Sequence, residues 1–270
     1  MPAIHLARLK IQVTELLVYF NSPVNFIREL HILLEFYADR TRRSGRSGTP
    51  KPLLRSYNVP RQVIRRIKSD SVQLIIENSQ RALSLADHLW EDNWFESRLL
   101  AISILGLLPL EYHIQVGERL QQWGKNCRED GLLDQLLDEG AASIQEDNPD
   151  EYQLLVEEWL SASEISSHKL GLRALPALVL NPTFENLPVV FRLLAPLIRE
   201  STSVLETDLL RAVRALGKRS PNETAYFLRQ NFIAPHKSGL AVITRRSLDV
   251  FPLELQKLLR EVLREQMYTQ

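Results

Sequence analysis

Two aspartates stand within an apolar stretch of the sequence. Asp134 and Asp138 belong to the segment 131–138, which reads Gly-Leu-Leu-Asp-Gln-Leu-Leu-Asp. On a helix, residues four positions apart lie one turn apart and can share a face. A carboxylate in such a setting can stabilise positive charge that develops in a transition state. The alternative is that both aspartates simply point to solvent.

Basic residues are concentrated in one stretch near the N-terminus. Between Arg40 and Lys68 there are ten basic residues and no acidic one. Residues 87–164 contain 18 acidic and four basic residues, and residues 165–270 contain 15 basic and nine acidic ones. This segregation indicates an anionic partner for the first and last thirds of the chain, or segments that neutralise one another in the fold.

The total charge and the absence of other motifs exclude several classes of function. Lysine plus arginine and aspartate plus glutamate both number 33, so only the distribution of charge favours nucleic-acid binding. Cys127 is the single cysteine, the six histidines never lie four positions apart, and no glycine-rich phosphate loop occurs. We therefore expect no metal and no cofactor. The charged start 1–10 and the short apolar run 99–110 predict no signal peptide and no membrane partner, hence a cytoplasmic protein.

The elements that position these residues are predicted to be helices. Leucine-rich segments with helical spacing run almost end to end, and strand signals are nearly absent. The small residues Ala101, Gly171 and Ala212 lie in similar apolar segments, 70 and 41 positions apart. A period of about 35–45 residues with paired helices is typical of HEAT-like repeats. We expect an all-α fold, an α-solenoid of about 12–14 helices forming a single domain over residues 1–270; the alternative is a plain α-helical bundle.

Local signals mark helix starts and one long loop. Ser220 with Glu223, and Asn93 with Glu96, have the spacing of an N-cap pair in which each side chain satisfies a backbone amide. The segment 39–58 is rich in glycine, serine and basic residues and resists helix formation. It is predicted to be a flexible basic loop, because loops of this length are usually functional or disordered.

Four segments, in this order, resemble a known family. They are 57–65, with Pro60 and Arg65; 85–101, with Trp90 and Glu96; 159–172; and 210–246. Together they are similar to the HEAT-like DNA alkylation repair proteins, the AlkD-like DNA glycosylases. The resemblance implies a solenoid with a basic concave face that holds duplex DNA. It also implies base excision repair, in which cationic N-alkylated bases such as N3-methyladenine and N7-methylguanine are removed by hydrolysis of the N-glycosidic bond.

The resemblance also assigns site residues, with departures from the family pattern. Asp134 takes the place of the catalytic aspartate, but Asp130 and Gly131 stand where a tryptophan and an aspartate are expected. His168 and Lys169 replace paired arginines, and Arg211 replaces a DNA-facing tryptophan. The residues expected to bind DNA are Arg42, Arg43, Arg46, Arg55, Arg61, Arg65, Arg66, Lys169, Arg173, Arg211, Arg214, Arg245 and Arg246.

Two functions therefore stay open at this point. The first is a DNA-binding member of this family that excises alkylated bases, which the basic stretch and Asp134 favour. The second is a non-catalytic solenoid that binds another protein, which the missing aromatic residues and the acidic middle of the chain favour. The two differ in salt dependence, because binding to DNA phosphates weakens steeply as salt rises.

Overall fold

The computed structural model describes residues 5–39, 54–234 and 238–269, with side chains as far as residue 265. In these ranges the protein is all-α: the regular elements are fifteen α-helices and two short 3₁₀ helices, and extended pairing is limited to one isolated bridge. The predicted all-helical fold is confirmed. The predicted loop 39–58 lies mostly outside the described residues, since 40–53 are not among them.

The chain divides into two compact units, Met1–Asn148 and Pro149–Gln270, and the single domain that the sequence predicts stays a prediction. The helices of unit 1 are α1 (Leu6–Leu17), α2 (Pro23–Phe36), α3 (Arg61–Glu77), α4 (Ser79–Glu91), α5 (Phe95–Leu107), η1 (Leu110–Tyr112), α6 (His113–Asn126), α7 (Asp130–Asp138) and α8 (Ala142–Asp147). Those of unit 2 are α9 (Pro149–Ser161), α10 (Ile165–Leu180), α11 (Leu187–Arg199), α12 (Glu206–Arg219), α13 (Pro221–Ile233), α14 (Gly239–Ser247), η2 (Leu248–Val250) and α15 (Leu253–Thr269).

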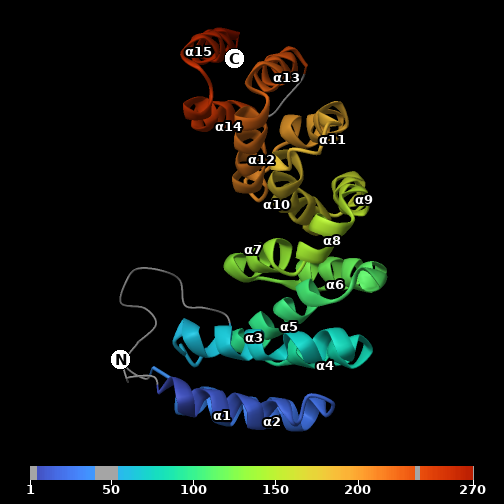
Figure 1. Cartoon of the computed structure of the whole chain (residues 1–270). Coiled ribbons are helices and arrows are strands. Elements are labelled where there is room, and N and C mark those ends of the chain that lie inside the picture. The colour runs from blue at the N-terminus through green and yellow to red at the C-terminus, as the bar shows by residue number, and fades with distance from the viewer. Residues whose placement is uncertain (1–4, 40–53, 235–237, 270) are drawn as a thin grey trace. The chain divides into compact units, whose positions relative to one another are not determined.

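In unit 1, several helices pack against the next helix but one as well as against a neighbour, as α3 does with α4 and α5 (Figure 1). Helices α1, α3, α5 and α7 contact one another in that order and form one layer, while α2 contacts α4 in a second layer. The buried apolar side chains recur at three- and four-residue spacing, as Leu9, Val13 and Leu16 do on α1. This pairing of successive helices is that of a HEAT-like solenoid.

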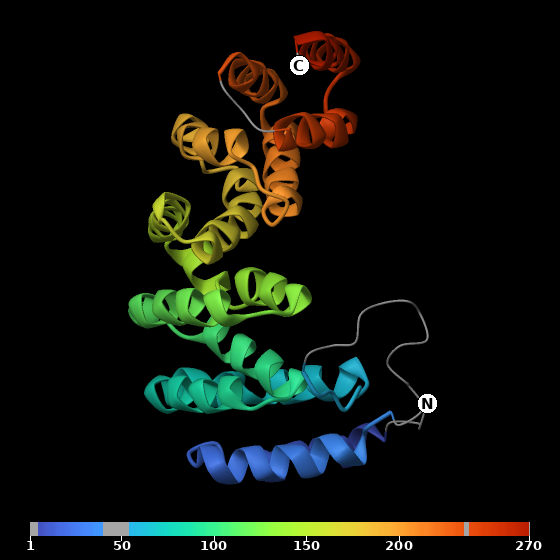
Figure 2. The same ribbon diagram turned by 180° about the vertical axis from the view of Figure 1, so that it is seen from behind.

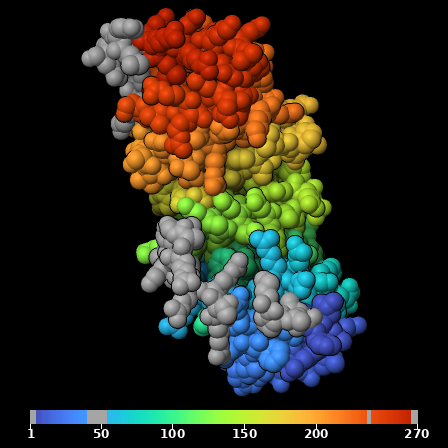
Figure 3. All heavy atoms as spheres, turned by 90° about the vertical axis from the view of Figure 1, so that its left-hand side faces the viewer, coloured from blue at the N-terminus to red at the C-terminus, as the bar shows by residue number. Residues whose placement is uncertain are grey.

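Unit 2 repeats the same arrangement. Helices α9, α11, α13 and α15 form one layer, and α10, α12 and α14 form the other, as the view from behind also shows (Figure 2). The space-filling view shows the side chains of this unit, orange to red, packed closely together (Figure 3). Each unit therefore carries its own core between two layers of helices.

Small residues allow close approach between helices, as the sequence predicts. Ala101 and Ala212 are fully buried, and a Cβ atom added to Gly171 of α10 would lie 2.8 Å from Leu160 Cγ of α9. Since real Cβ atoms do not come this close to other carbons, residue 171 must be glycine for α9 and α10 to pack as they do.

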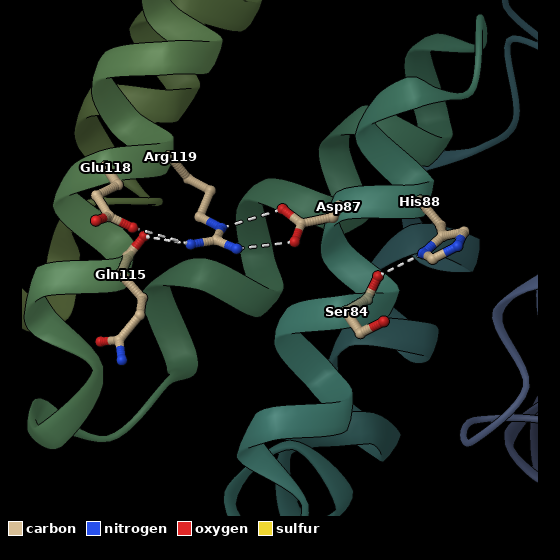
Figure 4. Close-up of polar contacts among 6 residues, drawn as sticks. All are labelled: Ser84, Asp87, His88, Gln115, Glu118 and Arg119. Atoms are coloured by element: carbon tan, nitrogen blue, oxygen red, sulfur yellow. Dashed lines mark hydrogen bonds and ion pairs between the residues drawn. The ribbon is translucent and has the colours of Figure 1, made fainter.

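Ion pairs between helices add polar contacts at the edges of unit 1. Arg119 of α6 donates two hydrogen bonds to Asp87 of α4, from Nε over 3.1 Å and from Nη2 over 2.9 Å (Figure 4). The hydrogen bond with Asp87 raises the pKa of Arg119 above its ordinary value, so the guanidinium stays charged. Its fork geometry matches the carboxylate and fixes the distance between the two helices.

The predicted helix caps have different outcomes. Helix α13 begins at Pro221 as predicted, but the Ser220 side chain caps no backbone amide; its Oγ donates to the Glu223 carboxylate instead, which lowers the pKa of Glu223. Helix α5 begins at Phe95, after Trp94, and Glu96 does not pair with Asn93. The predicted Asn93–Glu96 cap is therefore wrong, because Glu96 bonds to residues of a distant segment instead.

No single helix among the described residues has the length and apolar composition needed to cross a membrane. Helix α5 and the following residues 110–126 meet that requirement only when taken together, and they are bent by 114° at their junction.

Candidate functional site

A hollow of about 630 Å³ opens on unit 1 among α3, α5, α7 and the segment that precedes α3. Its walls combine basic, acidic and apolar side chains. They are Ser56, Asn58, Val59, Arg61, Ile64, Arg65, Lys68, Phe95, Glu96, Leu99, Gly131, Gln135 and Glu139.

The N-terminal end of α3 provides the positive charge of this hollow. Arg61 is the first residue of the helix and Arg65 lies one turn later, and both side chains are exposed. Neither has an acidic partner among the described residues, and no side chain caps the helix at Pro60. The N-terminal end of a helix carries partial positive charge. Two cations placed there are therefore repelled by that charge and by each other. The free backbone amides and the two guanidinium groups together form a site for anions.

Lys68, the third cation of the hollow, is neutralised within the fold. Lys68 Nζ of α3 donates to both carboxylate oxygens of Glu139, over 2.8 and 2.9 Å. Ser103 Oγ of α5 donates to the same carboxylate over 2.5 Å. Because Lys68 and Glu139 cancel each other, the unpaired positive charge on this side belongs to Arg61 and Arg65.

Glu96 is the buried carboxylate of the hollow. Only 3% of the residue is exposed, and its Oε1 accepts hydrogen bonds from Ser56 Oγ over 2.8 Å and from the Asn58 amide over 2.9 Å. Asn58 has a φ of 54°, in the left-handed region, which asparagine tolerates better than most residues. Glu96 therefore holds the turn that leads the chain into α3 and its arginines.

Backbone and aromatic contacts fix the same turn. The Phe95 amide donates to the Arg55 carbonyl over 2.8 Å, which joins Arg55 and Trp94 in a parallel bridge. The Tyr57 ring stacks on Trp94 with centroids 4.0 Å apart and planes 9° apart. Residues 54–58 of the predicted loop are thus held against the start of α5 and are not a free linker.

A chain of hydrogen bonds links the Tyr57 hydroxyl to residues of α2 and α5. His31 of α2 lies 3.2 Å from the Tyr57 hydroxyl through Nδ1 and 3.1 Å from Asp92 Oδ2 through Nε2. Ser97 Oγ donates to the same Asp92 oxygen over 2.6 Å. Burial, and then the nearby carboxylates, raise the pKa of Tyr57 above its ordinary value, so its hydroxyl keeps its proton.

Asp134 lies on α7 but outside the wall of the hollow. The face of α7 toward the hollow carries Gly131, Gln135 and Glu139, at four-residue spacing. Asp134 is half-buried and stands a quarter-turn away from Gln135 on the helix. Its predicted catalytic role thus stays a prediction, while Glu96 and Glu139 are the carboxylates that line the hollow.

The other predicted DNA contacts of unit 1 have different positions. Arg66 is in an ion pair with Asp70 over 2.7 Å, one turn along α3. Arg55 is exposed on the turn before α3, near the hollow. Arg42, Arg43 and Arg46 lie outside the described residues.

In unit 2, Arg173 is buried in an ion pair, and its predicted role in DNA binding stays a prediction. Its side chain is 3% exposed and its Nε donates to Asp208 Oδ1 over 2.8 Å, with the Asp208 side chain 2% exposed. Burial raises the pKa of Asp208, and the charge of Arg173 opposes this rise. A phosphate could reach Arg173 only if this buried pair were broken.

The other predicted DNA contacts of unit 2 are exposed or half-buried, and two of them are in ion pairs. Arg214 makes two hydrogen bonds of 2.6 Å to Asp249, which raise the pKa of Arg214 and lower that of Asp249. Arg246 donates to Glu206 over 2.8 Å. Lys169 is half-buried, and Arg211 and Arg245 are exposed. Arg211 and Arg245 are therefore exposed at the surface, where a phosphate could reach them.

The sequence did not predict the roles that Glu96 and Lys68 have in the structure. Both belong to segments that the sequence singles out, Glu96 in the second resembling segment and Lys68 at the end of the basic stretch. Their roles depend on partners 38 to 71 residues away in the sequence, such as Glu139 for Lys68. A charged residue within the apolar segment 95–107 is the signal that marks Glu96.

The family profile described as DNA alkylation repair enzyme matches residues 34–247, which include the whole hollow and most of unit 2. No curated protein and no solved structure matches the chain.

Proposed function

Since the chain belongs to the DNA alkylation repair enzyme family, we propose that it binds duplex DNA through the phosphate backbone and excises cationic N-alkylated bases. Binding is expected to show little preference for sequence, because phosphate contacts carry no sequence information. N3-methyladenine and N7-methylguanine are the bases that we propose as substrates.

The observation that carries the proposal is the pair Arg61 and Arg65 at the start of α3. These exposed guanidinium groups have no acidic partner among the described residues and stand beside free backbone amides. An arrangement of this kind is unfavourable without an anion and favourable with one. Phosphate oxygens accept hydrogen bonds from guanidinium groups in a fork geometry, so two successive phosphates suit two arginines one turn apart.

The proposed chemistry needs little from the protein beyond electrostatics. Alkylation at N3 or N7 makes the base a cation, and its departure moves positive charge onto the sugar. A carboxylate near C1′ stabilises this charge without acting as a base, and water then forms the new C–O bond. By its position in the sequence we propose Asp134 for this carboxylate.

Two measurements test this proposal. Affinity for an unmodified duplex is measured at several salt concentrations; each phosphate neutralised steepens the log–log slope by about 0.9. Release of N7-methylguanine from an alkylated duplex is compared between the wild type and Asp134→Asn, which keeps the shape of the side chain and removes its charge. An Asp134→Asn variant as active as the wild type would remove Asp134 from the mechanism.

A second candidate function is a scaffold for another protein. The ion pairs of Arg173, Arg214 and Arg246 favour it, because they withdraw three cations of unit 2 from the set that was expected to bind DNA. A flat dependence of DNA affinity on salt, together with no base release, would support this function over the first.

A further inference from the structure

A groove of about 850 Å³ lies between α11 and α13 of unit 2, two helices that pack against each other (Figure 1). These helices belong to the layer of α9, α11, α13 and α15. The residues of unit 2 that are expected to bind DNA stand on α10, α12 and α14, which form the other layer. The groove is therefore separate from those residues, and the proposed function does not use it.

Aromatic side chains make up much of the groove lining. Phe191 of α11 and Phe227 of α13 have ring centroids 5.0 Å apart, with Phe191 half-buried and Phe227 buried. Tyr226, the neighbour of Phe227, is 64% exposed. Apolar surface that faces water is unfavourable, and an exposed patch of this kind in a groove is typical of an interaction site. Tyrosine is also among the residues that contribute most to binding energy at interfaces.

Two exposed carboxylates, Glu185 and Glu223, give the groove its charge. Neither is in an ion pair with a cation of the described residues, and no lysine or arginine lines the groove within those ranges. The hydrogen bond from Ser220 lowers the pKa of Glu223, which keeps this carboxylate charged at neutral pH. Arg219, close by in the sequence, donates to the Phe184 carbonyl and not to either carboxylate. The groove thus carries net negative charge.

The charged and the aromatic residues occupy different stretches of the groove. Leu187 begins α11, Glu185 lies just before it, and Glu223 belongs to the first turn of α13. Phe191 and Phe227 each lie about one turn further along their helices. The groove is therefore acidic where the two helices begin and apolar further along.

We propose that this groove docks an amphipathic helical segment of another protein. Its apolar side chains cover Phe191 and Tyr226, and its lysine or arginine residues pair with Glu185 and Glu223. A groove between two helices suits the apolar face of a third, and complementary charge sets its orientation. The two carboxylates repel phosphate, so nucleic acids and anionic lipid surfaces fit this groove poorly. The inference does not depend on DNA binding by unit 1.

The variant Tyr226→Ala tests the apolar part of the groove. It removes an exposed ring, so the fold is expected to be retained, which circular dichroism checks. The control is Ile233→Ala, which removes a side chain of the same helix that is 74% exposed and stands outside the groove lining. The two variants thus differ in where exposed apolar surface is lost.

The double variant Glu185→Gln/Glu223→Gln tests the charge of the groove. Glutamine keeps the size of each side chain and removes the negative charge. The control Glu158→Gln/Glu254→Gln changes exposed carboxylates of α9 and α15, which lie outside the groove lining in the same unit. Because both double variants change the net charge equally, the control accounts for general attraction of basic peptides.

The probe is a library of random peptides displayed on phage, selected on the full chain and counter-selected on Tyr226→Ala. We expect enriched peptides to have apolar residues at three- and four-residue spacing, with lysine or arginine beside them. The most enriched peptide is then synthesised and labelled, and its dissociation constant is measured for each variant by fluorescence anisotropy. Tyr226→Ala should weaken binding about tenfold or more and Glu185→Gln/Glu223→Gln by roughly 3- to 10-fold, while both controls stay within about twofold of the wild type.

Affinity for an unmodified DNA duplex is measured with the same variants. Tyr226→Ala should bind the duplex as the wild type does, because the groove lies on the layer opposite the predicted DNA contacts of unit 2. A loss of duplex affinity in a folded Tyr226→Ala would overturn the inference, since the groove would then contact nucleic acid.

Three other results would also overturn the inference. They are no peptide enriched over the Tyr226→Ala target, enriched peptides that lack basic residues, and controls that weaken peptide binding as much as the groove variants do. A wild type that binds the peptide at the groove but binds no duplex would refute the proposed function and support the inference.

Discussion

Replacing Arg173 by alanine is expected to destabilise unit 2 strongly. Any loss of DNA binding by this variant is expected to follow from that loss of stability. The Arg173 guanidinium and the Asp208 carboxylate are both buried, and Arg173 Nε lies 2.8 Å from Asp208 Oδ1. Removing the arginine leaves a buried carboxylate whose pKa is already raised by burial. Breaking a buried pair in this way costs about 3–5 kcal/mol of unfolding free energy.

The size of this loss depends on pH in a direction that the structure fixes. Without Arg173, the folded-state pKa of Asp208 lies still further above its unfolded value, because the largest opposing charge is gone. A group whose pKa is raised in the fold binds protons more tightly when folded, so the variant loses stability as pH rises above the unfolded pKa. Arg173→Ala should therefore lose more stability at pH 7 than at pH 4.

Urea unfolding with hydrogen exchange of unit 2 peptides measures this loss. With a slope of about 2 kcal/mol per molar urea, the midpoint should fall by about 1.5–2.5 M. Arg65→Ala, an exposed arginine, serves as the control and should stay within about 0.5 kcal/mol of the wild type. A loss below about 1 kcal/mol for Arg173→Ala would refute the structural role that we assign to this residue.

Three further substitutions test the packing and the start of α13. Gly171→Ala should lower the unfolding free energy by about 1–3 kcal/mol because its Cβ would meet Leu160, whereas Gly131→Ala, whose Cβ would meet nothing within 4 Å, should be neutral or gain up to about 1 kcal/mol. Thermal unfolding at neutral pH compares the two. Glu223→Gln should cost about 0.5 kcal/mol at pH 7, since the hydrogen bond from Ser220 lowers the pKa of the exposed Glu223. This difference should vanish as pH falls below about 4, and a difference that persists at pH 3 would show that charge plays no part.

Features set by neighbouring residues were predictable from the sequence. Helical spacing of leucines and the absence of strand signals predict the all-α fold, and the Ser220–Glu223 spacing predicts a pair that the structure contains. The place of Gly171 in a helix contact follows from its position in an apolar helical segment. These features depend on residues within about one helical turn, or on residue size alone.

Features set by distant partners were not predictable. The spacing of Asn93 and Glu96 indicates a cap, yet Glu96 bonds to Ser56 and Asn58, which lie 40 and 38 positions away. The sequence likewise cannot distinguish the buried Arg173 from the exposed Arg65, because the distinction depends on where Asp208 lies in the fold. Division into two units also depends on contacts that no local pattern records.

The salt dependence of duplex binding by the double variant Arg61→Glu/Arg65→Glu tests the central claim most directly. The wild type should bind duplexes of different sequence alike, and the variant should bind all of them more weakly, with a log–log slope shallower by about 1.8. The control Arg81→Glu reverses an exposed arginine of α4 in the same unit, away from the hollow, and should leave the slope unchanged. An unchanged slope in the double variant would contradict the claim that the start of α3 binds DNA phosphates.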